Sequence, residues 1–186
     1  RWYHGITRYQ WLVLLIASLG WGFDIFEGQI FVASMRDAMP QLLGVDSADH
    51  PKVGVWSNYS FASFLLGGAF GGVLFGVMSD RIGRSRTLIF TILFYSIFTS
   101  LTALASEAWH MVILRFLVAM GVGGEWAVAS AMVAEVMPQR SRPVMSSIFH
   151  ASSVFGTLLA AAVGYFILSV KPWGDSTWKL GFLIGL

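Results

Sequence analysis

Long apolar runs separated by short polar segments dominate the sequence. A helix needs about 20 mostly apolar residues to cross the roughly 30 Å hydrocarbon core of a bilayer. Five runs reach that length, and a sixth begins near the end of the sequence. The pattern therefore predicts an all-α integral membrane protein with five complete spans and the start of a sixth. The predicted spans cover residues 11–35, 55–78, 87–106, 108–137, 143–170 and, incompletely, 178–186.

The composition agrees with a membrane protein and excludes several other classes. Only 12% of the 186 residues are charged, while 56% are apolar; soluble domains usually carry about 25% charged residues. The net charge is only +2, and the basic residues lie between the apolar runs instead of on one face. We therefore expect no nucleic-acid partner. The sequence has no cysteine, which excludes disulfides.

Basic residues in the connecting segments predict the orientation of the chain, because cytoplasmic loops carry an excess of Lys and Arg. If the N-terminus is cytoplasmic, seven arginines fall on that side and four basic residues fall outside. We therefore expect a cytoplasmic N-terminus and a place in the cytoplasmic (plasma) membrane. The seven are Arg1, Arg8, Arg81, Arg84, Arg86, Arg140 and Arg142, and the four are Arg36, Lys52, Lys171 and Lys179.

Two short segments indicate an internal repeat. Residues 37–41 read DAMPQ and residues 135–139 read EVMPQ, and at the same offset of 98 residues Glu27 aligns with Glu125. The offset equals three helices with their loops, and an odd number of helices inverts the second unit. Inverted repeats recur in secondary transporters, with the binding site at the repeat interface near the midplane. We expect a 3+3 inverted repeat. We also expect a fragment of a longer protein, because a half-crossed helix leaves backbone groups unsatisfied in lipid.

Four charged residues lie deep inside two of the predicted spans. Asp24 and Glu27 lie in the first span, and Arg115 and Glu125 lie in the fourth. Charges near the bilayer centre cost roughly 2.5–3.5 kcal/mol on insertion scales and usually mark substrate or proton pathways. At about 1.5 Å per residue, Asp24 is nearly central, while Glu27 and Arg115 lie roughly 6 and 9 Å toward the outside. Glu125 lies about 6 Å toward the inside, too deep to be the first partner of Arg115.

These positions indicate a water-accessible central cavity that handles protons. Burial favours the protonated form of a carboxyl group and a neighbouring arginine favours its charged form. An acid in that balance can load and release a proton. Glu27 is the first candidate for proton coupling, followed by Asp24. Arg115, Glu125 and Gln29 are candidates for the substrate site or an ion pair. A structural ion pair with snorkelled side chains is the alternative.

Glycines are concentrated in two of the spans. In the second span they form overlapping small-xxx-small steps, which let helices approach closely, so we expect close packing there. In the fourth span they fit either packing or a break in the helix beside the site. The first set is Gly67, Gly68, Gly71, Gly72 and Gly76, and the second is Gly121, Gly123 and Gly124.

The segment between the second and third spans carries the most specific motif. Residues 76–86 read GVMSDRIGRSR, which resembles the signature loop of the major facilitator superfamily, G-x-x-x-D-[R/K]-x-G-[R/K]-[R/K]-[R/K]. Ser85 departs from the basic residue usual at its position. The matching residues are Gly76, Asp80, Arg81, Gly83, Arg84 and Arg86.

Other segments resemble the same superfamily. Arg115 begins a stretch similar to its span-four R…G motif, and Glu135 and Arg142 fit the E-x-x-P-x-x-x-R motif of its sugar and organic-acid porters. Residues 24–27, DIFE, are similar to the D-G-x-D motif of proton symporters for aromatic acids and related compounds, with Ile and Glu replacing the second and fourth residues. The whole chain thus resembles the first half of such a symporter, of the aromatic-acid and sialic-acid type.

The resemblance implies a fold and a set of roles. Residues 1–186 would form the first six-helix bundle of a twelve-helix transporter, with the C-terminal half of the same protein as a partner. Asp80, with Gly76 and Arg84, would latch the two halves together on the cytoplasmic side. Breaking and remaking this latch would bias the inward-open state against the outward-open state. The expected latch comprises Gly76, Asp80, Arg81, Gly83, Arg84, Arg86, Glu135 and Arg142.

We therefore expect proton-coupled symport of a small organic anion or sugar acid by alternating access, with protons, the substrate and the lipid bilayer as partners. A neutral-sugar symporter and a drug/proton antiporter are the transporter alternatives. A membrane scaffold or signalling protein is the alternative from another class. The four histidines are dispersed over separate segments, so we expect no enzyme activity, metal or cofactor. His150, alone in the fifth span, is expected to be a hydrogen-bonded packing residue.

Overall fold

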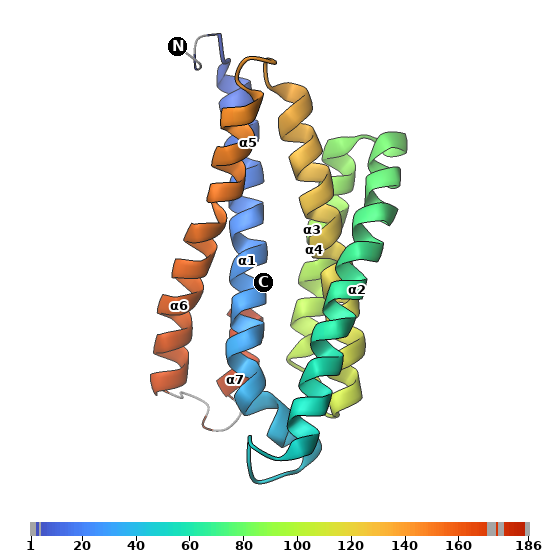
Figure 1. Ribbon diagram of the computed structural model, residues 1–186, viewed down its shortest axis with the longest axis vertical. Coiled ribbons are helices and arrows are strands. Elements are labelled where there is room, and N and C mark those ends of the chain that lie inside the picture. The colour runs from blue at the N-terminus through green and yellow to red at the C-terminus, as the bar shows by residue number, and fades with distance from the viewer. Residues whose placement is uncertain (1–2, 4, 171–173, 175–176, 185–186) are drawn as a thin grey trace.

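Helices form nearly all of the structure, a computed structural model that describes residues 3, 5–170, 174 and 177–184. These residues contain helices and turns but no strand. Five helical stretches are long and apolar enough to cross a membrane, which confirms the predicted all-α membrane fold. The helices, shown in Figure 1, are α1 (Arg8–Leu43), α2 (Pro51–Ile82), α3 (Arg84–Thr102), α4 (Ala108–Val136), α5 (Arg142–Ala151), α6 (Ser153–Val170) and α7 (Thr177–Ile184).

The fifth predicted span is two helices, because α5 and α6 are separated at Ser152. The Ser152 hydroxyl donates to the carbonyl of Phe149 at 2.6 Å and to the carbonyl of Ser18 in α1 at 3.1 Å. Serine hydroxyls that bond to backbone carbonyls compete with the helical ladder and often bend it. The hydroxyl of Ser152 therefore accounts for the break, and its bond to Ser18 ties the bend to the middle of α1.

The packing of the helices has the symmetry expected of an inverted repeat. α1 contacts α5, α6 and α7, while α4 contacts α2 and α3, and α1 and α4 contact each other. The two groups are visible on the left and right of Figure 1. Exchanging α1 with α4, α2 with the α5–α6 pair and α3 with α7 maps the main helix contacts onto themselves. The offset of three helices predicted from the sequence therefore agrees with the packing.

Glycines bring the backbones of α2 and α4 together. A Cβ at Gly67 would overlap the backbone of Phe116, and one at Gly71 would overlap the backbone of Met120. Small residues at this spacing allow such an approach, so the predicted close packing is confirmed. In the fourth span, α4 is continuous through its glycines, and Gly124 packs on Phe75 of α2. The packing alternative therefore holds for α4, and the broken-helix alternative is wrong.

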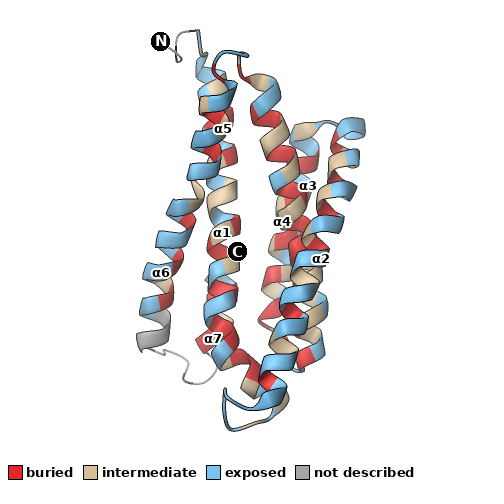
Figure 2. Cartoon of the chain, in the orientation of Figure 1, coloured by how far each residue is buried: buried red, intermediate tan, exposed pale blue. Residues whose placement is uncertain are grey.

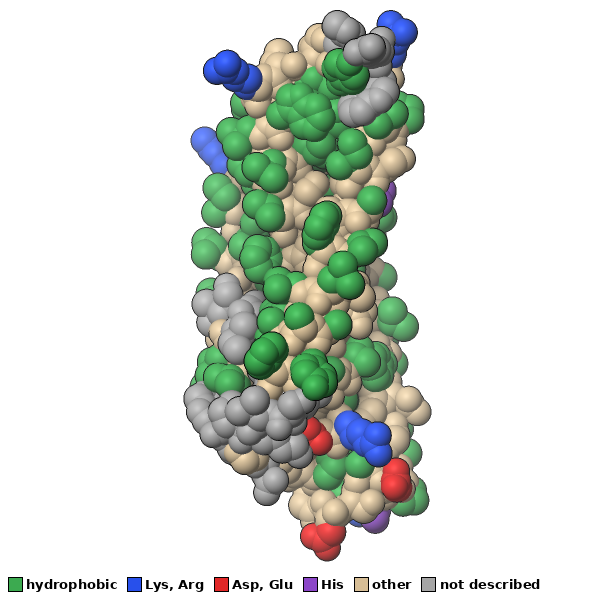
Figure 3. Space-filling model, turned by 90° about the vertical axis from the view of Figure 1, so that its left-hand side faces the viewer, with side chains coloured by type: hydrophobic (Ala, Val, Ile, Leu, Met, Phe, Trp, Pro, Cys, Tyr) green, Lys and Arg blue, Asp and Glu red, His purple; other side chains and the backbone are tan. Residues whose placement is uncertain are grey.

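Burial is uneven among the helices. About half of the apolar stretch of α4 is buried, whereas α2 is mostly exposed, and Figure 2 shows the buried positions following α4 and α1. On the face seen in Figure 3, hydrophobic side chains cover the middle of the molecule and charged ones gather toward its ends. This is the distribution of a membrane-spanning bundle, with α1 and α4 at its centre.

Candidate functional site

A buried ion pair joins α1 to α4. The Nη1 atom of Arg115 donates to Oε1 of Glu27 at 2.5 Å, and the two side chains are 0% and 1% exposed. The Nη2 atom of Arg115 donates to the hydroxyl of Thr102 in α3 at 2.9 Å. The rings of Phe31 and Phe182 lie 4.7 and 5.0 Å from the guanidinium carbon. One arginine thus connects α1, α3, α4 and α7.

The ion pair does not satisfy all of its own polar atoms. Oε2 of Glu27 and Nε of Arg115 are buried and have no hydrogen-bond partner among the described residues. A buried pair gains little net stability unless its remaining lone pairs and protons are bonded. Loss of one partner is costly, because it leaves the other charge buried alone. If Glu27 and Arg115 separate, Arg115 therefore favours another anion, and Glu27 favours a proton.

Two more carboxyl groups lie in the same region. Asp24 is 2% exposed, and neither of its oxygens has a hydrogen-bond partner within the described part of the chain. The side chain of Glu125, also 2% exposed, reaches from α4 to Gly20 of α1, where a Cβ would collide with its Oε1. Asp24 interacts electrostatically with both Glu125 and Glu27, and Tyr95 of α3 interacts with all three acids.

Sequence reasoning found part of this arrangement. Matching depth placed Glu27 with Arg115, and the structure pairs them. Depth did not place Glu125 beside Asp24, nor did it find Tyr95. The available signal was Gly20, four residues before Asp24, which leaves room for a side chain from another helix. Gln29, a candidate from the sequence, is exposed on α1.

Aromatic side chains from three helices adjoin this region. The Trp21 ring lies 6.4 Å from Trp126 and 6.2 Å from Phe149. His150, expected to be a hydrogen-bonded packing residue, is exposed on α5, and its ring lies 6.2 Å from Trp126 and 5.0 Å from Phe149. We call Trp21, Trp126, Phe149 and His150 the aromatic group. Trp21 and Trp126 also line a groove of about 590 Å³ formed by α1, α2 and α4.

A second charge cluster lies where α2 meets α3. Nη2 of Arg84 lies 2.8 Å from Oδ1 of Asp80 and 2.7 Å from Oε1 of Glu135. Nε of Arg84 donates to the other oxygen of Glu135 at 3.2 Å, and Nη1 donates to the hydroxyl of Ser79. The side chains of Asp80 and Glu135 are 66% and 55% exposed. This cluster therefore brings together three charged residues of the expected latch at the surface, namely Asp80, Arg84 and Glu135.

The turn of the signature loop depends on one glycine. Gly83 alone separates α2 from α3 and has φ +95° and ψ 151°. Residues with a side chain rarely adopt this conformation, so glycine is required there. Gly76, about two turns earlier on α2, has open space where a Cβ would lie. It therefore presents a bare surface on the outside of this bundle.

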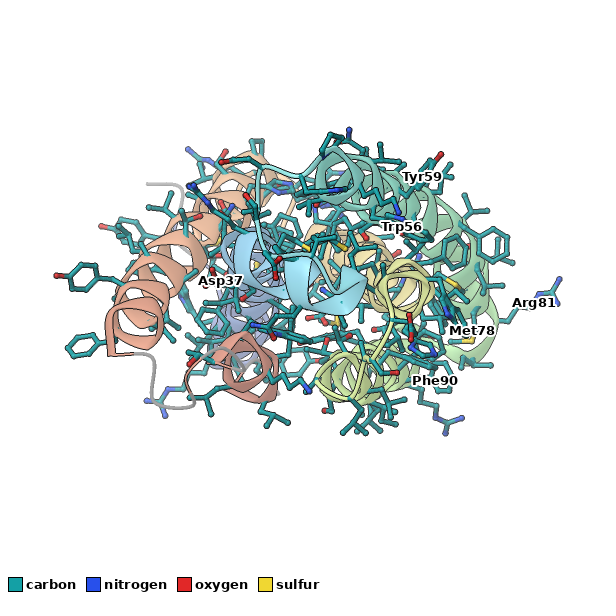
Figure 4. The ribbon with its side chains drawn as sticks, turned by 90° about the horizontal axis from the view of Figure 1, so that it is seen from below. Asp37, Trp56, Tyr59, Met78, Arg81 and Phe90 are labelled. Atoms are coloured by element: carbon teal, nitrogen blue, oxygen red, sulfur yellow. The ribbon has the colours of Figure 1, made fainter. Side chains whose placement is uncertain are left out.

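The other arginines of the expected latch take different positions. Arg81 points away from the bundle in Figure 4, and Arg86 is exposed. Nε of Arg142 donates to the carbonyl of Met137 at 3.1 Å, and its charge interacts with Glu135. Within the described residues, Arg142 thus extends the cluster around Arg84, while Arg81 and Arg86 face outward.

Comparison with known proteins places this architecture in a family. Residues 11–186 match the family described as sugar (and other) transporter. The gentisate transporter of Corynebacterium glutamicum is 29% identical over 93% of this chain and 37% of its own length. The sialic acid transporter NanX of Escherichia coli K12 is 28% identical over 100% of this chain and 42% of its own length. The chain thus spans about two fifths of the length of these relatives.

A solved structure has the same fold. A double-tryptophan mutant of XylE superposes on 96% of this chain with a TM-score of 0.84 at 22% sequence identity, and the match covers 42% of that chain. The fold agreement, the signature loop and the family match support one another. The chain belongs to the sugar (and other) transporter family of the major facilitator superfamily.

Proposed function

We propose that the full-length protein carries a small organic anion or sugar acid in symport with protons by alternating access. The observation that carries this proposal is the buried Glu27–Arg115 pair between α1 and α4, with Asp24 and Glu125 beside it. In-membrane ionisable groups usually belong to substrate or proton pathways. Relatives named for gentisate and sialic acid support an acidic substrate.

Arg115 offers one positive charge to two competing anions. When the carboxylate of a substrate pairs with Arg115, Glu27 loses its partner in a buried position. An unpaired buried carboxylate is strongly disfavoured, so Glu27 takes up a proton from the cavity. When the substrate leaves, Glu27 releases that proton and pairs with Arg115 again. Substrate binding and proton binding are thereby linked through a single guanidinium group.

The position of the pair suits alternating access. Glu27 belongs to α1 and Arg115 to α4, the central helices of the two units of the inverted repeat. Binding sites of such transporters lie at the repeat interface near the midplane. The second half of the protein would supply the opposite wall of the cavity. The Asp80–Arg84–Glu135 cluster would act as a latch that holds the two halves together at one end.

The latch marks the side of the membrane. Most of the arginines in the connecting segments lie at the end of the bundle that holds Arg84, where the chain also begins (Figure 1). By the excess of basic residues on the cytoplasmic side, we assign this end and the N-terminus to the cytoplasm, in the plasma membrane. The latch would then close the cytoplasmic entrance.

The aromatic group favours a substrate with a ring. The rings of Trp21, Trp126 and His150 lie next to one another, with centroids 6.4 and 6.2 Å apart, and come from α1, α4 and α5. Nε1 of Trp21 is buried and has no hydrogen-bond partner among the described residues, so it is available as a donor. Aromatic faces and an indole N–H together suit a flat or cyclic ligand that also carries polar groups.

Uptake by the full-length protein in proteoliposomes tests the proposal. Radiolabelled gentisate and sialic acid are the probes, with an inward proton gradient. We expect Glu27→Gln to lower acid-driven accumulation but to retain exchange of internal for external substrate, because Arg115 still binds the anion. Asp46→Asn, at an exposed loop position, is the control and should behave like the parent protein. If Glu27→Gln and Asp24→Asn both leave acid-driven uptake intact, the proposal is wrong.

A further inference from the structure

Asp24 and Glu125 form a pair of acids that the exchange between Glu27 and the substrate does not use. We propose that these two carboxyl groups hold one proton between them at neutral pH and form a second proton-binding site. The existence of this site does not depend on the proposed function. Its consequence for transport, a second proton in each cycle, does rest on that function.

Burial without hydrogen-bond partners disfavours the ionised forms of Asp24 and Glu125. Both oxygens of Asp24 and Oε2 of Glu125 are buried and have no hydrogen-bond partner among the described residues. An ionised carboxylate in such a position pays its desolvation cost without compensation. A protonated carboxyl group pays much less, and its O–H can donate to a neighbouring carboxylate. The protonated form therefore fits this environment better.

Carboxyl groups outnumber cations in this buried region. Three carboxyl groups and one guanidinium share the region, and the guanidinium is 2.5 Å from Glu27. That pair is neutral as a unit and leaves Asp24 and Glu125 without a cation. Two neighbouring like charges in a low-dielectric site cannot both ionise cheaply. One shared proton removes one charge and gives the remaining carboxylate a donor.

The surroundings of the pair supply no substitute for the proton. The ionisable side chains that interact with Asp24 are Glu125 and Glu27, both acids. Tyr95 of α3 carries a neutral hydroxyl and adds no positive charge. On α5, His150 lies against the ring of Trp126 and is exposed. Within the described residues, Arg115 is the cation of the region, and Glu27 already holds it.

Gly20 shows that the chain makes room for this arrangement. A Cβ there would collide with the Glu125 carboxylate, so glycine allows the acid of α4 to reach α1 one turn before Asp24. Any larger residue would push Glu125 away. Packing therefore places the Glu125 carboxylate against α1 one turn before Asp24.

A second proton changes the energetics of transport. For a monovalent anion, one proton gives electroneutral symport, whereas two protons move one net positive charge. With the membrane potential clamped at zero, each coupled proton contributes about a tenfold accumulation per pH unit. The parent protein would then accumulate its substrate about 100-fold per pH unit, and Glu125→Gln about tenfold.

Infrared spectroscopy of the full-length protein in lipid vesicles tests the site directly and needs no substrate. At neutral pH, exposed carboxyl groups are ionised, so the carbonyl band of a protonated carboxylic acid reports buried protons. We expect this band in the parent protein, with a shift in D₂O, and its loss in the double variant Asp24→Asn/Glu125→Gln. Asp46→Asn, at an exposed loop position, should retain the band.

The outcomes separate this site from the proposed function. Absence of the band in the parent protein, or its persistence in the double variant, would overturn the second proton site. If the double variant does not fold, Glu125→Asp decides: a shifted band supports the site, and an unchanged band contradicts it. Acid-driven uptake that is unchanged in Glu27→Gln would contradict the proposed role of Glu27. It would not alter the infrared band expected of the parent protein.

Discussion

Two arginines of this chain bind carboxylates in opposite environments. Arg115 holds Glu27 in the interior, with both side chains at most 1% exposed. Arg84 holds Asp80 and Glu135 at the end of α2, where those acids are more than half exposed. Arg84 makes more bonds, yet Arg115 is the arginine whose loss would leave a buried carboxylate without its cation. The number of contacts is therefore a poor guide to the importance of a charge.

Solvent explains the difference. Exposed ion pairs contribute about 0–1 kcal/mol, because water and salt replace most of the attraction. A buried pair repays desolvation only through close geometry, and loss of one partner costs about 3–5 kcal/mol. The interior pair can therefore act as a switch that responds to a proton or an anion. The exposed cluster suits a latch that opens and closes at small cost.

Removal of each arginine gives the largest contrast. Arg115→Met leaves Glu27, Asp24 and Glu125 buried with no cation, and we expect a loss of about 3–5 kcal/mol in the free energy of unfolding. Arg84→Met should cost about 0–1 kcal/mol. Thermal unfolding of the full-length protein in detergent measures both. Equal losses in the two variants would contradict the distinction between interior switch and surface latch.

A glycine on α2 positions the helix that carries Arg115. A Cβ at Gly71 would overlap the backbone of Met120, so Gly71→Ala must push α4 away from α2. We expect a loss of about 1–3 kcal/mol together with weaker acid-driven uptake. Gly54→Ala is the matched control on the same helix, because a Cβ there meets open space within this bundle. Uptake unchanged in Gly71→Ala would mean that the ion pair tolerates movement of α4.

Gly83, in the turn of the signature loop, positions the exposed charge cluster around Arg84. Gly83→Ala forces a side chain into the conformation at φ +95°, which costs about 1–3 kcal/mol, and it alters the entry of α3 at Arg84. We expect lower thermal stability with little change in the infrared band of the buried acids. A spectrum altered as strongly as that of the double variant Asp24→Asn/Glu125→Gln would show that the two charge clusters are not independent.

Some of this arrangement could be predicted from sequence because it depends only on distance along the chain. Run length placed the spans, and depth along the membrane normal matched Glu27 to Arg115. Depth is a one-dimensional quantity, however, and it does not say which way a side chain points around its helix. The approach of Glu125 to Asp24 depends on that rotation, which tertiary packing sets through Gly20. The break at Ser152 likewise depends on a carbonyl of α1, 134 residues away.

Added salt should weaken the exposed charge cluster but not the buried ion pair, although the change in stability is small. Glu135→Gln removes two bonds from Arg84, and we expect a loss of about 0.2–1 kcal/mol that shrinks at high salt. The Debye length falls from about 10 Å at 0.1 M to about 3 Å at 1 M, but this screening acts on exposed charges. The cost of Glu27→Gln should therefore stay constant across the same salt series. If the stability losses of both variants fell together as salt rose, water and ions would have to reach Arg115. The Glu27–Arg115 pair would then be hydrated, like the cluster around Arg84.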